Sequence, residues 1–167
     1  NESTVRLSAL AENNTPFSIS VASAASFNPE EDVVASAIKK LEAARLLGFS
    51  GLFESNQQWW HAYWEKAFVH LNSQDEVADL VEENYNYYLY LMASSSRGDY
   101  PTKFNGMLWT TGGDARKWGG LYWGANQSCL YNAIFPSNRL ALMDPMFNMY
   151  SKAYQSFATA AVQQWGS

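Results

Sequence analysis

Residues 28–48 read Asn-Pro-Glu-Glu-Asp-Val-Val-Ala-Ser-Ala-Ile-Lys-Lys-Leu-Glu-Ala-Ala-Arg-Leu-Leu-Gly, and this stretch decides the fold class. Its apolar residues recur every three or four positions, as at Val34 and Ile38, which is the spacing of one face of a helix. Asn28 is a favoured N-cap residue, and the acidic residues after it suit the positive end of the helix dipole. Gly48 is a typical helix stop. We therefore predict a helix that begins after Asn28 and ends at Gly48.

Three further stretches carry the same helical period. The second and third helices are predicted to open at Ser55 and Ser73, because each serine is followed three residues later by a Gln or Glu, the spacing of a capping box. The third helix runs to about Ser95. The fourth begins with Asp144 as its N-cap and continues to Trp165. A mainly α fold follows.

Upstream of these helices the apolar period is two. Alternating runs at residues 4–11 and 17–22, separated by turn-forming residues, predict two short strands. An isolated hairpin is only marginally stable in water, so these strands are expected to join a larger sheet. We therefore expect a β segment over residues 1–27, the tail of a preceding β-domain or a linker, and a helical portion over residues 28–167.

Composition excludes several classes of function. A net charge of −5 and the lack of a basic stripe argue against a protein that binds the nucleic-acid backbone. The apolar runs are broken before they reach a membrane-spanning length, so no membrane association is expected. Cys129 is the only cysteine, which excludes an intramolecular disulfide, and its apolar neighbours predict a small buried residue. His61 and His70 do not have a ligand spacing, so we expect neither a metal nor a cofactor.

Residues 96–138, between the third and fourth helices, form a long glycine-rich stretch that is predicted to be irregular. Loops of this length in a compact domain are usually functional. Its central part, which we call the aromatic loop (residues 99–132), concentrates many of the chain's seven Trp and ten Tyr residues among glycines and amides. An aromatic face stacks on a sugar ring, and side-chain amides hydrogen-bond with hydroxyl groups.

The aromatic loop therefore fits a neutral polyhydroxylated ligand, and its glycines do not match a phosphate-cradling loop. The predicted substrate-binding residues are Asn105, Trp109, Trp118, Tyr122, Trp123 and Asn126. The competing interpretation is structural, because the same aromatic residues would also bury a loop against the helices beneath it.

Four motifs appear in order along the chain. They are Trp-Trp-His-Ala-Tyr-Trp at residues 59–64, Ala-Ser-Ser-Ser-Arg at 93–97, Pro-Thr-Lys-Phe-Asn-Gly-Met-Leu-Trp at 101–109, and Trp-Gly-Gly-Leu-Tyr-Trp-Gly-Ala-Asn at 118–126. In this order and spacing the chain resembles the catalytic domain of glycoside hydrolase family 95, whose best-known activity is an α-L-fucosidase. The resemblance covers roughly half of the chain.

The resemblance implies a partial (α/α)6 barrel, also called an α/α toroid, preceded by a β-sandwich and a linker. It implies hydrolysis of fucoside- or galactoside-like bonds by an inverting acid/base mechanism, with an oligo- or polysaccharide as substrate, outside the cell or in the periplasm. In this family paired asparagines position the catalytic water, and Asn126 is the one that matches. The general acid and the residue acting with the base would lie on later helices. An incomplete barrel exposes its apolar inner face, so self-association or contact with the remainder of the protein is expected.

Glycoside hydrolysis needs two carboxyl groups at a defined separation. The carboxylates near aromatic residues are Glu54, Glu65, Asp99, Asp114 and Asp144. Glu54 and Asp114 are the candidates for facing a sugar, and spacing identifies no partner for either, so the catalytic residues are unknown. The alternative hypothesis is a non-catalytic helical module that binds glycan or serves as an interaction domain.

Overall fold

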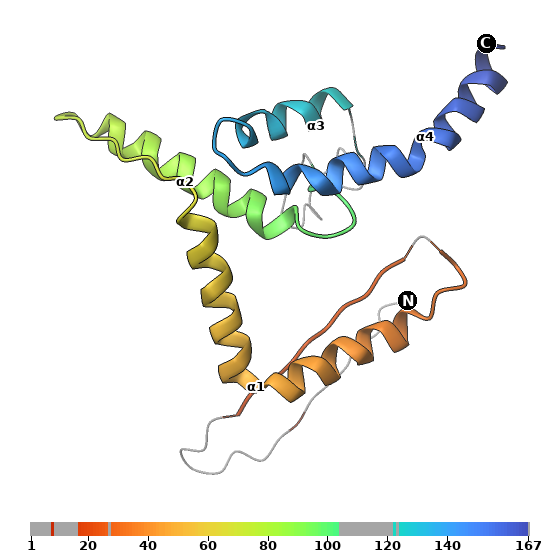
Figure 1. Ribbon diagram of the computed structural model, residues 1–167, viewed down its shortest axis with the longest axis horizontal. Coiled ribbons are helices and arrows are strands. Elements are labelled where there is room, and N and C mark those ends of the chain that lie inside the picture. The colour runs from red at the N-terminus through yellow and green to blue at the C-terminus, as the bar shows by residue number, and fades with distance from the viewer. Residues whose placement is uncertain (1–7, 9–16, 27, 104–121, 123, 167) are drawn as a thin grey trace. The chain divides into compact units, whose positions relative to one another are not determined.

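The computed structural model describes residues 8, 17–26, 28–103, 122 and 124–166, which are mainly helical, as the apolar period predicted (Figure 1). The helices are α1 (Val33–Trp64), α2 (Val77–Ser95), α3 (Gly124–Tyr131), the 3-10 helices η1 (Asn132–Ile134) and η2 (Leu140–Met143), and α4 (Asp144–Trp165). The chain divides into two compact units, Asn1–Tyr63 and Trp64–Ser167. In the described part of the chain, no helix is both long and apolar enough to cross a membrane.

The first two predicted helices form one element, α1, with a kink at Gly48. Gly48 has φ 65° and ψ 176°, a conformation that is essentially restricted to glycine. The stop at Gly48 is thus confirmed as a break, but the predicted start at Ser55 is wrong because the chain is helical again directly after the kink. The N-cap prediction at Asn28 is also wrong. Asp32 caps α1, since its Oδ1 accepts the backbone N–H of Ala35 at 2.9 Å.

The N-terminal segment does not have the predicted β structure where it is described. Residues 17–26 are extended without strand assignment, and no strand is assigned among the other described residues to pair with them. Their tie to α1 is polar: Lys40 Nζ donates to the carbonyl of Ser23 at 2.9 Å. The strand predicted at 17–22 is therefore corrected to an extended segment. The strand predicted at 4–11 lies outside the described residues, apart from Ser8.

A polar cluster ahead of α2 replaces the predicted capping box. Ser73 Oγ accepts the N–H of Ala78 at 2.9 Å, and Asp75 Oδ1 accepts that of Val77 at 3.2 Å. Ser73 Oγ in turn donates to Asp75 Oδ1 at 2.6 Å, and this bond is the main cause of the lowered pKa of Asp75. Glu76 adopts a left-handed φ of 60°, so it does not complete the box, and the helix begins at Val77.

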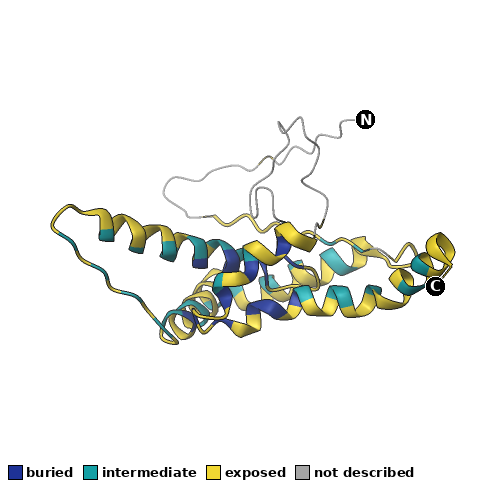
Figure 2. Ribbon diagram, turned by 90° about the horizontal axis from the view of Figure 1, so that it is seen from above, coloured by how far each residue is buried: buried dark blue, intermediate teal, exposed yellow. Residues whose placement is uncertain are grey.

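The core of the second unit lies where α2 meets α3 and the two 3-10 helices (Figure 2). Its buried apolar residues are Leu89, Met92, Ala93, Tyr131, Ile134, Leu142 and Met143. Tyr88 joins α2 to α3, because its hydroxyl donates to the carbonyl of Leu130 at 2.6 Å. On the same helix Tyr87 and Tyr90 are exposed.

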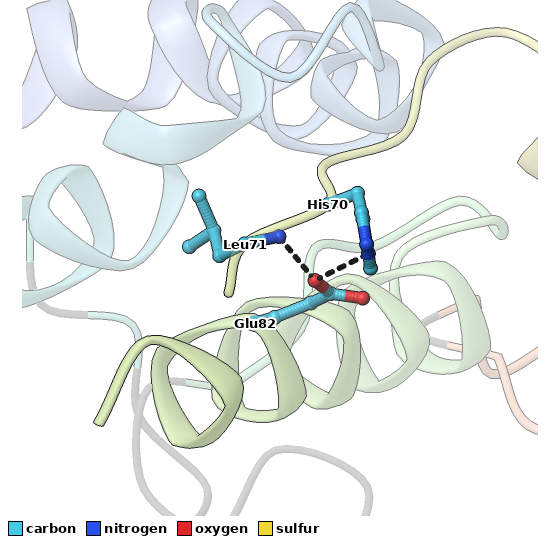
Figure 3. Close-up of polar contacts among 3 residues, drawn as sticks. All are labelled: His70, Leu71 and Glu82. Carbon is cyan, nitrogen blue, oxygen red and sulfur yellow. Dashed lines mark hydrogen bonds and ion pairs between the residues drawn. The ribbon is translucent and has the colours of Figure 1, made fainter. Parts of the chain in front are cut away.

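The link between α1 and α2 is held by two side chains. Glu82 of α2 accepts the backbone N–H of Leu71 at 2.6 Å and lies 3.4 Å from Nδ1 of His70 (Figure 3). Arg139 is buried, and its guanidinium donates to the carbonyl of Ala67 at 2.8 Å and to that of Ser137 at 3.3 Å. Together these bonds fix the link within the second unit.

Candidate functional site

Two of the six predicted substrate-binding residues lie in the described part of the aromatic loop. Tyr122 lies two positions before the first residue of α3, and Asn126 lies in the first turn of that helix. Both residues are exposed. The other four, Asn105, Trp109, Trp118 and Trp123, lie outside the described residues.

The stretch expected to be irregular contains helix. Residues 124–131 form α3 and residues 132–134 form η1, so the irregular region predicted over 96–138 is corrected there. The sequence did not indicate this helix because glycine disfavours helix interiors. Here Gly124 is the first residue of the helix, where glycine destabilises it only slightly. The burial of Gln127 and Tyr131, four residues apart on one face, stabilises the helix against the core.

At the described ends of the aromatic loop, buried hydrogen bonds form a chain in which each donor can be assigned. Thr102 N–H donates to Tyr131 Oη at 3.1 Å, and Ser96 Oγ donates to the carbonyl of Leu142 at 2.9 Å. Because the hydrogen of Ser96 is used there, the 2.5 Å contact between Ser96 and Tyr131 is a bond in which the phenol donates. The chain therefore links the end of α2, the start of the loop, α3 and η2.

A second buried bond closes the base of the aromatic loop. The side-chain amide of Gln127 donates to the carbonyl of Thr102, so residues 25 positions apart in the chain are held together. Two oxygens at this point, Oγ1 of Thr102 and Oε1 of Gln127, are buried and have no hydrogen-bond partner among the described residues. Such orphaned polar atoms are costly, and they are found where a protein holds a water or a functional group.

Three tyrosines gather above this base. Burial raises the pKa of the Tyr122 phenol, and the nearby Tyr131 and Tyr100 raise it further. Burial also raises the pKa of Tyr131, although the backbone N–H of Thr102, which donates to its hydroxyl oxygen, opposes the shift. Tyr100 and Tyr122 are 42% and 38% exposed, so both keep aromatic surface open to solvent. The described ends of the loop therefore bring these three tyrosines near one another, and Asn126 is exposed in the first turn of α3.

The carboxylates considered from the sequence do not join this cluster in any contact that the structure shows. Glu54 lies in the other unit, where its Oε1 accepts from Gln58 at 3.2 Å. Asp144 is not the N-cap of α4, since it already has helical φ and ψ directly after η2. Glu65 and Asp99 are exposed, and Asp114 lies outside the described residues. Among the described residues, no group of His, Cys, Asp or Glu side chains is arranged to hold a metal ion.

The sequence did not single out the residues that anchor the site, namely Ser96, Thr102 and Tyr131. Each is a common residue in a polar or mixed stretch, and only their convergence from separate elements makes them a unit. The side-chain nitrogen of Gln127 also acts inside the protein, where it donates to the carbonyl of Thr102. The prediction that Cys129 is buried is wrong: α3 turns its side chain to solvent.

No protein-family model matches the chain, and neither curated proteins nor solved structures give a match. The resemblance to glycoside hydrolase family 95 therefore rests on the four sequence motifs alone.

Proposed function

We propose that the chain is the sugar-recognising part of a carbohydrate-active hydrolase, with an oligo- or polysaccharide bound over α3. The observation that supports it best is that two exposed tyrosines, Tyr100 and Tyr122, lie near each other, with Asn126 exposed in the first turn of the following helix. Burial raises the pKa of the Tyr122 phenol, so this side chain stays neutral at physiological pH, and a neutral aromatic and amide surface suits a polyhydroxylated ligand.

The finer proposal follows from the motifs. In it the helices are part of an (α/α)6 barrel of the family 95 type, acting on fucoside- or galactoside-like bonds by inversion outside the cell or in the periplasm. Asn126 is the residue proposed to orient water, and the proton-transferring carboxylates belong to later helices. On this proposal the present chain binds sugar without hydrolysing it.

A non-catalytic glycan-binding module is the second candidate. It is favoured by the carboxylates that have other roles in the structure, such as Glu54 with Gln58. Hydrolysis requires two carboxyl groups across the scissile bond, whereas recognition requires only aromatic and hydrogen-bonding groups.

The test is a glycan array followed by calorimetric titration with fuco- and galacto-oligosaccharides. Tyr122→Ala is expected to weaken binding by roughly tenfold or more, as loss of one aromatic stacking surface does. Tyr87→Ala is the matched control, because Tyr87 is another exposed tyrosine, on α2 and outside the site. Equal affinity of the two variants, or no glycan binding by the unmodified chain, would overturn the proposal. Release of 4-nitrophenol from a nitrophenyl glycoside would contradict its non-hydrolytic part.

A further inference from the structure

The second half of α4 has no cover among the described residues. The helix is anchored at its start, where Pro145 is buried beside η2, and none of residues 151–166 is buried (Figure 2). Tyr154, Phe157 and Trp165 are 70%, 56% and 73% exposed. Figure 1 shows this half of α4 running on beyond α3 to the C-terminus. A large aromatic surface is thus presented to solvent.

This half of the helix also lacks charge. After Lys152 no Asp, Glu, Lys or Arg occurs in residues 153–167. Helices that face water usually carry charged residues on the open side, and isolated helices of about 15 residues are marginally stable. The composition is therefore that of a helix whose surface is covered when the protein is assembled.

Five residues of α4, three of them exposed and two partly buried, follow the spacing of a coiled-coil seam. Phe147, Tyr150, Tyr154, Phe157 and Ala161 are separated by three, four, three and four positions, and we call them the aromatic seam. The rings of Tyr150 and Phe157 lie 6.5 Å apart, which places them on one face of the helix. Lys152 falls at an outer position of this repeat, away from the seam.

We propose that the aromatic seam binds a second copy of this chain, with the two α4 helices antiparallel. Pairing about the midpoint between Gln155 and Ser156 places Tyr154 opposite Phe157 of the second copy. The same register places Tyr150 opposite Ala161 of the second copy, so a large side chain meets a small one at each end. Antiparallel packing also brings opposite ends of the two helix dipoles together, and no charge enters the interface.

The area available reaches the lower limit for a specific dimer interface. Phe147, Tyr154, Phe157 and the flanking Trp165 are between 52% and 73% exposed. At 150–250 Å² for a whole aromatic side chain, these four cover about 500 Å² per copy. Two copies bury roughly 1,000 Å², the lower bound for a specific interface. This assignment is independent of the sugar site, which lies on other elements.

Analytical ultracentrifugation of the full chain tests the proposal. A concentration-dependent dimer is expected, and Phe157→Glu is expected to raise its dissociation constant by roughly a hundredfold, because a charge is buried in the seam. Thr159→Glu is the matched control: it adds the same charge to the same helix at an outer position and is expected to leave the dimer intact. Circular dichroism establishes that both variants remain helical. A monomer at every concentration, or equal dissociation by both variants, overturns the proposal.

Cross-linking tests the direction of packing, in a Cys129→Ser background because Cys129 is exposed. A mixture of Tyr150→Cys and Ala161→Cys chains is expected to form disulfides across the dimer. Either variant alone is not expected to form them. In the proposed register, position 150 of one copy is offset from position 150 of the second copy by 11 residues along the helix axis, about 16 Å, and the same holds for position 161. Efficient cross-linking of either variant alone indicates parallel packing and overturns the proposal. A monomer in which Trp165 fluorescence is blue-shifted indicates cover from within the same chain and overturns it too.

Discussion

The backbone N–H of Thr102 lies 3.1 Å from the hydroxyl of Tyr131, so the start of the aromatic loop is bonded to the helix that follows it. Both residues are almost fully buried, at 2% and 1% exposure. The described start and end of the loop are therefore joined to each other inside the core. The change in the free energy of unfolding caused by substituting Tyr131 therefore measures how much this bond stabilises the protein.

Tyr131→Phe is expected to lower the free energy of unfolding by about 1–3 kcal/mol, because the buried N–H of Thr102 then lacks its acceptor. Urea denaturation measures the change. Tyr87→Phe removes the same hydroxyl from an exposed ring and is expected to change stability by less than about 0.5 kcal/mol. Similar losses in the two variants would contradict the network.

The contribution of Tyr131 is expected to depend on alkaline pH. Burial raises its pKa above the ordinary value of 10.0, so the unfolded chain loses this proton before the folded protein does. The stability that the neutral phenol supplies is complete below pH 10.0 and is lost as the pH rises through the folded-state pKa. Urea titrations on either side of this pH are expected to show the unmodified protein losing its advantage over Tyr131→Phe. A constant difference between the two would count against a buried phenol.

Two glycines of α1 are expected to respond in opposite directions to the same substitution. Gly48→Ala should destabilise the helix by about 1–3 kcal/mol, because Gly48 has a φ of 65° that alanine disfavours. Gly51→Ala should stabilise it by about 0.5–1 kcal/mol, because Gly51 is helical and its added Cβ meets Leu47 Cβ at an acceptable 3.4 Å. Thermal unfolding followed by circular dichroism measures both. A kink that tolerated alanine without loss would show that Gly48 is not required there.

Arg139→Lys is expected to lower the free energy of unfolding by about 2–3 kcal/mol. The guanidinium reaches the carbonyls of Ala67 and Ser137 together, and a single ammonium cannot span both. Hydrogen exchange at the link between α1 and α2 is expected to increase in this variant. Lys66→Arg is a suitable control, since Lys66 is exposed and adjacent. Unchanged exchange in Arg139→Lys would mean that other bonds hold the link.

Glu82 and His70 are expected to contribute unequally to the free energy of unfolding. Glu82→Ala removes the acceptor of the Leu71 N–H and is expected to cost about 1 kcal/mol. His70→Ala is expected to change stability by less than about 0.5 kcal/mol, because that side chain is 77% exposed and surface pairs are weak. Denaturation at low and high salt separates the two, since only the pair with His70 is strongly screened. A larger loss from His70→Ala would reverse this ranking.

The helical fold class and the approximate helices were predictable because their signals are local. The apolar period located α1, α2 and α4, and glycine marked the kink at Gly48. The predicted end of α4 at Trp165 is confirmed, and Gly166 follows it in a left-handed conformation. The strand prediction at residues 17–22 was wrong, because an alternating segment forms a strand only when it pairs with another, and the described residues include no such partner.

For the candidate site, the sequence by itself identified Tyr122 and Asn126 as members of an aromatic and amide-rich loop. Only the tertiary structure decided that α3 forms within that stretch, that Gln127 turns inward, and that Ser96, Thr102 and Tyr131 form its base. The physical reason is the range of the interactions. Helical periods and caps act over a few residues, whereas Ser96 and Tyr131 are 35 positions apart and meet only because the core brings α2 and α3 together.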